Sequence, residues 1–310
     1  MHKIQVINSA TRKSIEISDN EFNNLKLSNQ QIKATSSFLH HYSVFIKNLN
    51  SLERDVFYHA IDFKQYNNDQ YMVSNEVFAR ADHTVISHLA TFMKLPELLP
   101  SHLSRMLRST HEKKLAIEKK SALYDDPTSN YAFLCELRNS IVHSNVDLTI
   151  NTGISNFDGS EIGLFSFGYF INFDKFLKKS ARSGKVKILS PMRDALCDDK
   201  GRIDLMRSFS LCARAIYKEL LEPKVSELVS AIDNSIDSID RVLISNNLQS
   251  IKVPNFEQTK DYIVIAQDDL TISKLVIDRT KSLFSELRIP QPANFISIAP
   301  SYQASSKSFN

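Results

Sequence analysis

The spacing of apolar residues predicts a mostly helical protein. From about residue 20 to 144, apolar side chains recur every three or four positions, which is the period of an amphipathic helix. The polar run 67–69 interrupts this pattern, and Pro96 and Pro100 are expected to end a helix. The turn-forming residues 125–130 precede a helix that begins near Tyr131. We therefore expect four or five helices in the first half of the chain.

Other patterns lie on either side of this helical stretch. Segments 3–7 and 13–18 alternate apolar and polar residues, which is typical of a hairpin, and 146–150, 162–171 and 185–189 are β-rich. Helical spacing returns at 203–221 and 223–244, with a strand expected at 262–266 and a last helix at 270–287. The predicted fold is mainly α. It has an N-terminal β-hairpin at 1–20, a helical bundle at 21–145, a small β-rich insertion at 146–190, additional C-terminal helices packed on the bundle at 191–290, and a flexible tail at 291–310.

Composition excludes several classes of protein. Apolar residues make up 42% of the 310 positions and charged residues 24%, as in ordinary globular domains. Only six glycines are present, and the chain has neither a dinucleotide-binding fingerprint nor a P-loop. No apolar run has the length of a membrane span and no signal-peptide core is visible, so we expect a cytoplasmic protein that does not contact a membrane. Its three cysteines are expected to be reduced thiols.

Charge and histidine spacing limit the ligands. The histidines lack cysteines or close carboxylates at ligand spacing, so neither a metal nor another cofactor is expected. The net charge is only +3, so nucleic acid would have to bind to local basic patches. One such patch is the run 175–187, in which Lys178, Lys179 and Arg182 are candidates for RNA binding. A solvated loop face is the alternative interpretation of this run.

The strongest chemical signal is the segment 134–143, in which Arg138, Asn139 and His143 interrupt an apolar helical pattern. An arginine can hold a phosphate with two parallel hydrogen bonds, and a histidine can exchange protons near neutral pH. Together these groups can cleave RNA without a metal. Spacing alone is weak support, because the pair Arg54 and His59 has the same separation.

The context of the segment favours Arg138 over the other matches. The apolar residues around it form a stripe, whereas two bulky aromatic residues, Phe57 and Tyr58, occupy the interval between Arg54 and His59. A third match, Arg105 to His111, has a slightly longer gap. A capped helix end with a solvated arginine and a hydrogen-bonded histidine is the alternative interpretation of the preferred segment. We therefore place the candidate catalytic site at Arg138.

The segment Leu-Arg-Asn-x-Ile-Val-His resembles the Arg-x4-6-His motif of the HEPN superfamily, in which asparagine often follows the arginine. The resemblance covers at most the first half of the chain. It implies a HEPN-like bundle and a metal-independent endoribonuclease that acts as a toxin or anti-phage effector. By this resemblance His143 would activate the ribose 2′-hydroxyl or protonate the leaving oxygen, Arg138 would hold the scissile phosphate, and Asn139 would orient one of them. The expected partners are RNA, a second copy of the chain, and an antitoxin or defence-complex protein.

Helix geometry restricts how this site is assembled. Residues five apart on an ideal helix differ by about 140° around its axis, so Arg138 and His143 do not face one substrate from a regular helix. Either the helix distorts near Ser140 or at 144–145, or two copies meet across a two-fold axis.

Two alternative functions also remain open. One is a HEPN-like scaffold or binding subunit without catalysis, and the other is a helical regulator that binds nucleic acid.

Overall fold

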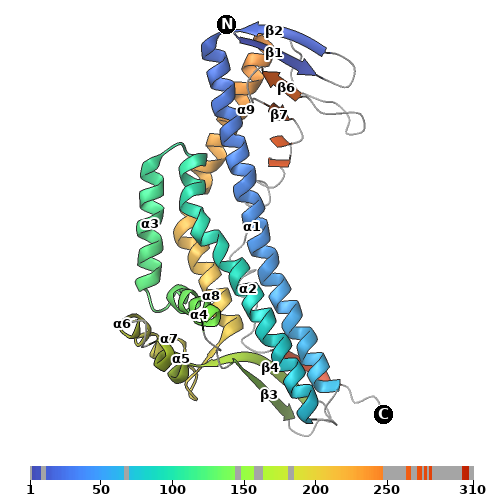
Figure 1. Cartoon of the computed structure of the whole chain (residues 1–310), viewed down its shortest axis with the longest axis vertical. Helices are drawn as coiled ribbons and strands as arrows, with labels where there is room; N and C mark the ends of the chain where they lie inside the picture. Colours follow the sequence, from blue (N-terminus) through green and yellow to red (C-terminus); the bar gives the residue numbers. More distant parts are fainter. Residues whose placement is uncertain are drawn as a thin grey trace. The chain divides into compact units, whose positions relative to one another are not determined.

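The protein is described by a computed structural model, and its helices and strands are shown in Figure 1. The structure describes residues 2–7, 12–65, 70–143, 148–156, 163–180, 185–246, 263–266, 271–273, 276–277, 279–280 and 302–306. The chain divides into two compact units, each assembled from segments distant in sequence. The first comprises Met1–Tyr42, Leu98–Ile117 and Leu221–Pro290, and the second Ser43–Glu97, Glu118–Leu220 and Gln291–Asn310. Helices α1 (Asp19–Gln65), α2 (Gln70–Met106) and α3 (Thr110–Asp125) contribute to both.

The first unit contains a four-stranded antiparallel sheet. Strands β1 (His2–Ile7) and β2 (Arg12–Ile17) form the predicted hairpin, and β6 (Ile263–Ala266) pairs with the other edge of β1 and with β7 (Thr271–Ser273). Side chains along each strand point alternately to the two faces of the sheet, and Ile4 and Ile17 are buried. Helix α1 then begins with a capping box, in which the Glu21 N–H donates to Ser18 Oγ at 3.2 Å and the Ser18 N–H donates to Glu21 Oε2 at 2.9 Å.

Helix α9 (Val225–Ser245) contributes an aliphatic stripe to the core of the first unit, next to a buried polar junction. The helix follows the short 3-10 turn η3 (Glu222–Lys224), and its apolar stripe is core, as the sequence predicted. The buried residues of the stripe include Leu228, Ile232, Ile236, Ile239 and Leu243. The Gln31 amide donates to the Met106 carbonyl and accepts a 2.8 Å hydrogen bond from Ser235. Its buried polar atoms are thereby paired across three helices.

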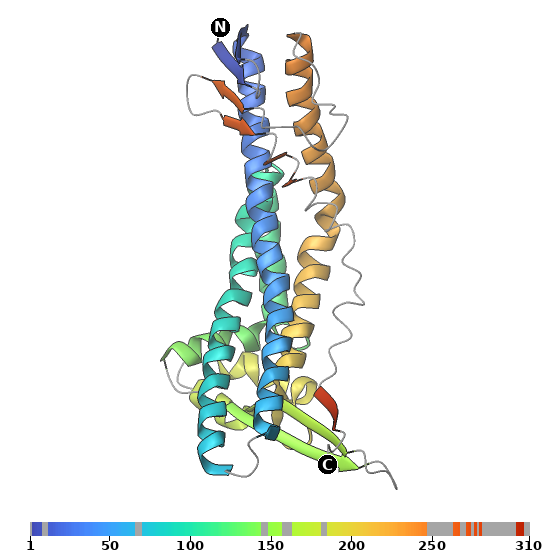
Figure 2. The same ribbon diagram turned by 90° about the vertical axis from the view of Figure 1, so that its right-hand side faces the viewer.

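The second unit joins helices to another small antiparallel sheet, whose long β3–β4 ribbon is visible in Figure 2. Its elements beyond the shared helices are α4 (Tyr131–His143), β3 (Leu148–Asn156), β4 (Gly163–Asn172), α5 (Phe173–Ser180), α6 (Val186–Leu189), α7 (Met192–Leu196), β5 (Arg202–Asp204), α8 (Leu205–Ile216), the π-helical turn η2 (Tyr217–Leu221) and β8 (Tyr302–Ser306). Three buried aromatic rings, Phe45, Phe92 and Phe209, connect α1, α2 and α8, with neighbouring ring centroids 4.7 and 5.0 Å apart.

One helix boundary differs from the prediction because burial offsets the cost of proline. Helix α2 continues through Pro96 and Pro100 to Met106, although each proline removes a backbone donor from the helix. Both prolines are buried, and the neighbouring Leu95 and Leu99 are almost inaccessible. Packing of this face therefore maintains the helix where local propensity predicts its end.

Segments that depend on tertiary pairing also differ from the prediction. The β-rich run 185–189 is helical and forms α6. The expected helix 270–287 opens with strand β7, which belongs to the sheet of the first unit, whereas the described residues 276–277 and 279–280 are helical as predicted. Its positions beyond 280 lie outside the described residues. Within the tail expected at 291–310, β8 pairs with residues of β4. Of these segments, β8 pairs with a strand that is remote in sequence, whereas β7 pairs with the preceding strand β6.

The coarse fold class is confirmed. The chain is mainly helical with small antiparallel sheets. Among the residues that the structure describes, no helix combines the length and the apolar character that crossing a membrane requires.

Candidate functional site

The helix that carries the predicted motif begins where the sequence places it. Asp126 Oδ1 accepts a 2.8 Å hydrogen bond from the Thr128 N–H, which forms the turn, and Asn130 has a positive φ of 61°. The buried Ser129 hydroxyl accepts a 3.1 Å hydrogen bond from the first helical N–H, that of Tyr131. These interactions satisfy polar groups that would otherwise be left unpaired at the helix start.

One face of α4 packs into the core of the second unit, and this packing fixes the orientation of the motif. Phe133, Leu134 and Leu137 are fully buried, and the Phe133 ring contacts Phe176 of α5 edge to face, with centroids 5.4 Å apart. Helix α4 also contacts α6 and α8. Because the apolar stripe faces inward, Arg138 is directed to the protein surface, as an amphipathic helix requires.

Arg138 is held at the surface by a carboxylate of another helix. Its guanidinium Nη1 donates to Glu97 Oε1 of α2, and the side chains are 38% and 48% exposed. A pair this accessible contributes at most about 1 kcal/mol to stability. Its main effect is geometric, since the contact restricts the long arginine side chain while the other guanidinium N–H groups can still bind a ligand. The adjacent Asn139 is exposed.

His143 is the last residue of α4, and its side chain lies outside the described part of the structure. The helix is regular through Ser140, so the distortion that the sequence allowed at that residue is absent. Residues 144 and 145 lie outside the described ranges. Along the helix, the backbone position of His143 comes four residues after Asn139, and therefore lies on the same side as that exposed residue.

The second Arg-x4-His match does not form a combined site in the structure. Arg54 is exposed and donates a 3.0 Å hydrogen bond to Ser51, one turn earlier on α1. His59 is half-buried, and its Nδ1 forms a hydrogen bond with the hydroxyl of the fully buried Tyr169 of β4. Burial lowers the pKa of His59 and raises the pKa of Tyr169. His59 therefore has a structural partner.

The predicted basic patch is partly described. Lys178 and Lys179 are exposed in the last turn of α5, whereas Arg182 lies outside the described residues. Phe176, which lies among these cations in the sequence, is buried against Phe133 and is not available to stack on bases. The two lysines therefore belong to a helix that packs directly on α4.

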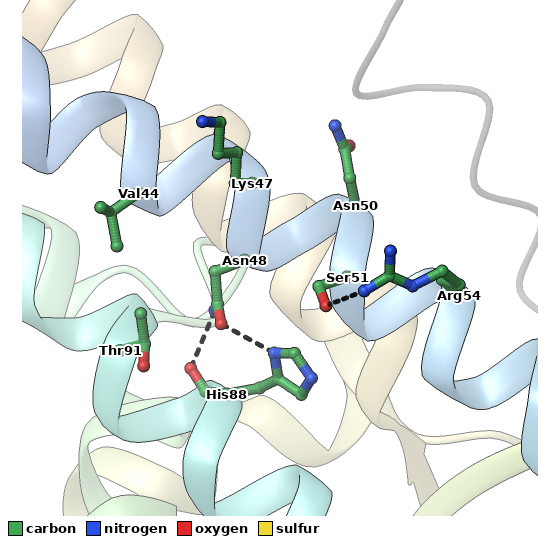
Figure 3. Close-up of a pocket in the computed structure, with 8 residues that line it drawn as sticks. All are labelled: Val44, Lys47, Asn48, Asn50, Ser51, Arg54, His88 and Thr91. Atoms are coloured by element: carbon green, nitrogen blue, oxygen red, sulfur yellow. Dashed lines mark hydrogen bonds between the residues drawn. The ribbon is translucent and has the colours of Figure 1, made fainter.

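A groove between α1 and α2 was not anticipated from the sequence. It encloses about 520 Å³, and eight residues line it: Val44, Lys47, Asn48, Asn50, Ser51, Arg54, His88 and Thr91 (Figure 3). Six of them are on α1, within the stretch from Val44 to Arg54. No short motif marks such a groove, because its floor depends on the pairing of two helices.

A buried hydrogen-bonded array forms the floor of this groove. His88 Nδ1 is hydrogen-bonded to Asn48 Oδ1 at 2.7 Å, and its Nε2 is hydrogen-bonded to Asp55 Oδ2 at 2.8 Å. The Asn48 amide in turn donates to the His88 carbonyl at 2.9 Å. Both ring nitrogens thus have an oxygen atom as hydrogen-bond partner. The Asp55 carboxylate is therefore committed to His88.

The cysteines show no features of reactive thiols. None of the three forms a disulfide, and burial raises the pKa of Cys135 to about 12 and that of Cys197 to about 11. Cys212 is fully buried, and burial raises its pKa well above the ordinary value of a thiol. Thiolates, the reactive form, are therefore scarce near neutral pH. Within the described ranges, no group of three or more His, Cys, Asp or Glu side chains has a metal-binding arrangement.

No protein-family model, curated protein or solved structure matches the chain. The resemblance to the HEPN superfamily therefore rests on the motif itself. Glu97 was not identified from the sequence as a partner of that motif. The one local signal was its position beside Pro96, which led to the expectation that the helix ends there.

Proposed function

We propose that the protein is a metal-independent endoribonuclease of HEPN type, with Arg138 and His143 as catalytic residues. The observation that supports this proposal is that α4 exposes the polar residues of the motif to solvent. Its apolar residues bury one face of α4, while Arg138 and Asn139 reach solvent. Glu97 of α2 also holds the arginine at this surface.

The chemistry of the site is transfer of the phosphorus from one oxygen to another. The ribose 2′-oxygen attacks the adjacent phosphorus, and the 5′-oxygen of the next nucleotide leaves. A base removes the 2′-hydroxyl proton and an acid protonates the leaving oxygen, roles that suit imidazole near neutral pH. Arg138 binds the phosphate and stabilises its developing negative charge. The products are a 2′,3′-cyclic phosphate and a 5′-hydroxyl, so the substrate is RNA.

A second copy of the chain supplies the geometry that a regular α4 lacks. Arg138 and His143 differ by about 140° around the helix axis, and the helix is unbroken at Ser140. In a two-fold dimer with the two α4 helices facing each other, Arg138 of one copy faces His143 of the other. In each such pair His143 acts as the base or as the acid. A role as a toxin or anti-phage effector, with an antitoxin or defence-complex partner, follows from the resemblance.

The proposal is tested by incubating purified protein with RNA in excess EDTA. We expect cleavage products that end in 2′,3′-cyclic phosphate. Arg138→Ala and His143→Ala should each reduce the rate by roughly two to four orders of magnitude, which is typical for loss of an acid–base or phosphate-binding group. Circular dichroism melting should be nearly unchanged for Arg138→Ala, because its ion pair is exposed.

Arg54→Ala and His59→Ala are the matched controls, since they alter the second Arg-x4-His pair. At saturating RNA both should cleave at a rate close to that of the unmodified protein. If they abolish cleavage while the Arg138 and His143 variants remain active, the site is assigned to the wrong pair. Binding of RNA without cleavage would indicate the nucleic-acid-binding regulator, and neither binding nor cleavage would indicate the scaffold.

A further inference from the structure

We propose that the groove between α1 and α2 is a second site, which binds the phosphate group of a nucleotide, either within an RNA strand or free in solution. The groove is separate from the Arg138 motif, and the proposal stands whether or not that motif cleaves RNA. Its cations are Lys47 and Arg54, both exposed and two helical turns apart on α1. Ser51 and Asn50 lie between them on the same side of the helix.

The donors of the groove are available to a ligand. Among the described residues, Lys47 and Arg54 form no ion pair, and the only hydrogen bond of Arg54 is the one donated to Ser51. This bond leaves the Ser51 hydroxyl hydrogen and most of the guanidinium N–H groups free to donate. Figure 3 shows Lys47, Asn50 and Arg54 projecting from α1 on the side away from His88. A cluster that offers mainly donors selects an oxyanion.

The contacts at the floor of the groove explain why no carboxylate of the groove pairs with Lys47 or Arg54. Asp55 follows Arg54 in sequence, but its carboxylate accepts a hydrogen bond from His88 at 2.8 Å and is turned toward α2. No carboxylate is among the eight residues that line the groove. Asn48 is held by two hydrogen bonds to His88, and apart from Val44 the lining consists of cations and neutral polar residues.

The size of the groove indicates more than a lone phosphate ion. A volume of about 520 Å³ falls within the range of small-molecule sites, and Val44 adds an apolar wall. The cations would hold the phosphate while the remaining space accommodates the attached sugar and base. Lys47 and Arg54 are separated by roughly 10 Å along the helix, so a strand could also contact them in succession.

Binding is measured by fluorescence anisotropy with a 2′-O-methyl RNA oligonucleotide, and by calorimetry with nucleoside monophosphates and with inorganic phosphate. The methylated strand has no free 2′-hydroxyl, so the measurement does not depend on catalysis at Arg138. We expect Lys47→Ala/Arg54→Ala to weaken binding of the oligonucleotide or the monophosphates by tenfold or more, the scale set by lost charge-assisted hydrogen bonds. Ser51→Ala, which keeps the charge, should weaken it severalfold.

The matched control is Lys26→Ala/Lys33→Ala, which removes two exposed cations with the same seven-residue spacing on the same helix. It should bind as the unmodified protein does. If the groove variant loses affinity for the oligonucleotide alone, the groove binds an RNA strand. If it loses affinity for the monophosphates, the groove binds a free nucleotide. The proposal is overturned if no probe binds, if the groove variant binds all probes normally, or if the control variant loses as much affinity.

Discussion

At the scale of single residues, His102 shows most clearly how burial changes chemistry. Its side chain is only 6% exposed, and its ring lies 3.2 Å from His41 Nδ1 and edge-on to Phe38. Burial, together with the nearby His41 and Arg105, lowers the pKa of His102 from 6.5 to about 4. The folded protein therefore keeps this imidazole neutral at a pH at which the unfolded chain would protonate it.

This depressed pKa predicts a loss of stability in acid. Between pH 6.5 and 4 the unfolded state binds a proton at His102 that the folded state does not, so the free energy of unfolding falls as the pH is lowered. The full effect is about 3 kcal/mol. His102→Gln, which cannot titrate, should lose less stability over this range in denaturant unfolding measured at each pH.

Comparing the unmodified protein with His102→Gln separates the contribution of His102 from that of other titrating groups. Asp204 acts in the opposite direction, because burial raises its pKa to about 6 and the folded state therefore retains a proton as the pH rises. Asp204 is present in both proteins, so its contribution cancels in the difference. Identical pH profiles for the unmodified protein and His102→Gln would show that His102 titrates normally in the folded protein.

At the scale of elements, α5 connects the motif helix to a basic surface. Phe176 packs on Phe133 of α4, and the last turn of α5 exposes Lys178 and Lys179. A helix that is anchored in this way can hold cations at a fixed position beside the motif. Such cations would bind the RNA backbone without taking part in proton transfer.

Reversing these charges should therefore weaken RNA binding without stopping the chemistry. We expect Lys178→Glu/Lys179→Glu to lower affinity for every RNA sequence tested, and to reduce the slope of log affinity against log salt by roughly 0.7 for each lost phosphate contact. The rate at saturating RNA should be preserved. Lys113→Glu/Lys114→Glu, an exposed adjacent pair on α3, is the control. Equal affinity and salt dependence in the two variants would identify the α5 lysines as an ordinary solvated face.

At the scale of the whole molecule, the proposed active site requires two copies of the chain. The cause is the regular geometry of α4, which separates Arg138 from His143 around the helix. A composite site also makes assembly a means of control, because an isolated chain would present only half of each catalytic pair. Light scattering should accordingly show a dimer or a higher even oligomer.

Mixing two inactive variants tests the composite site directly. Equal amounts of Arg138→Ala and His143→Ala chains, allowed to exchange, give dimers of which half are mixed. Each mixed dimer retains one intact site, so cleavage should recover to about a quarter of the unmodified level. Either variant alone should remain inactive. Absence of recovery despite demonstrated exchange would place both residues of a site on one chain, and a strictly monomeric protein would exclude the shared cleft.

The sequence by itself determined the features that depend on neighbours a few residues away. The aliphatic stripe of α9 was predicted as core because its period repeats along one helix face. The start of α4 at Tyr131 was predicted from its turn and capping residues, and the β1–β2 hairpin from strict alternation. The candidate motif was also visible, since its residues lie within six positions.

Only the tertiary structure decided the features whose partners are distant along the chain. Burial carries α2 through Pro96, and the next residue, Glu97, reaches Arg138 forty-one positions later. The floor of the groove between α1 and α2 depends on Asn48 meeting His88 across two helices, and β8 is a strand because β4 offers it an edge. Local periodicity and capping carry no information about such encounters, because their energy arises only when the elements pack together.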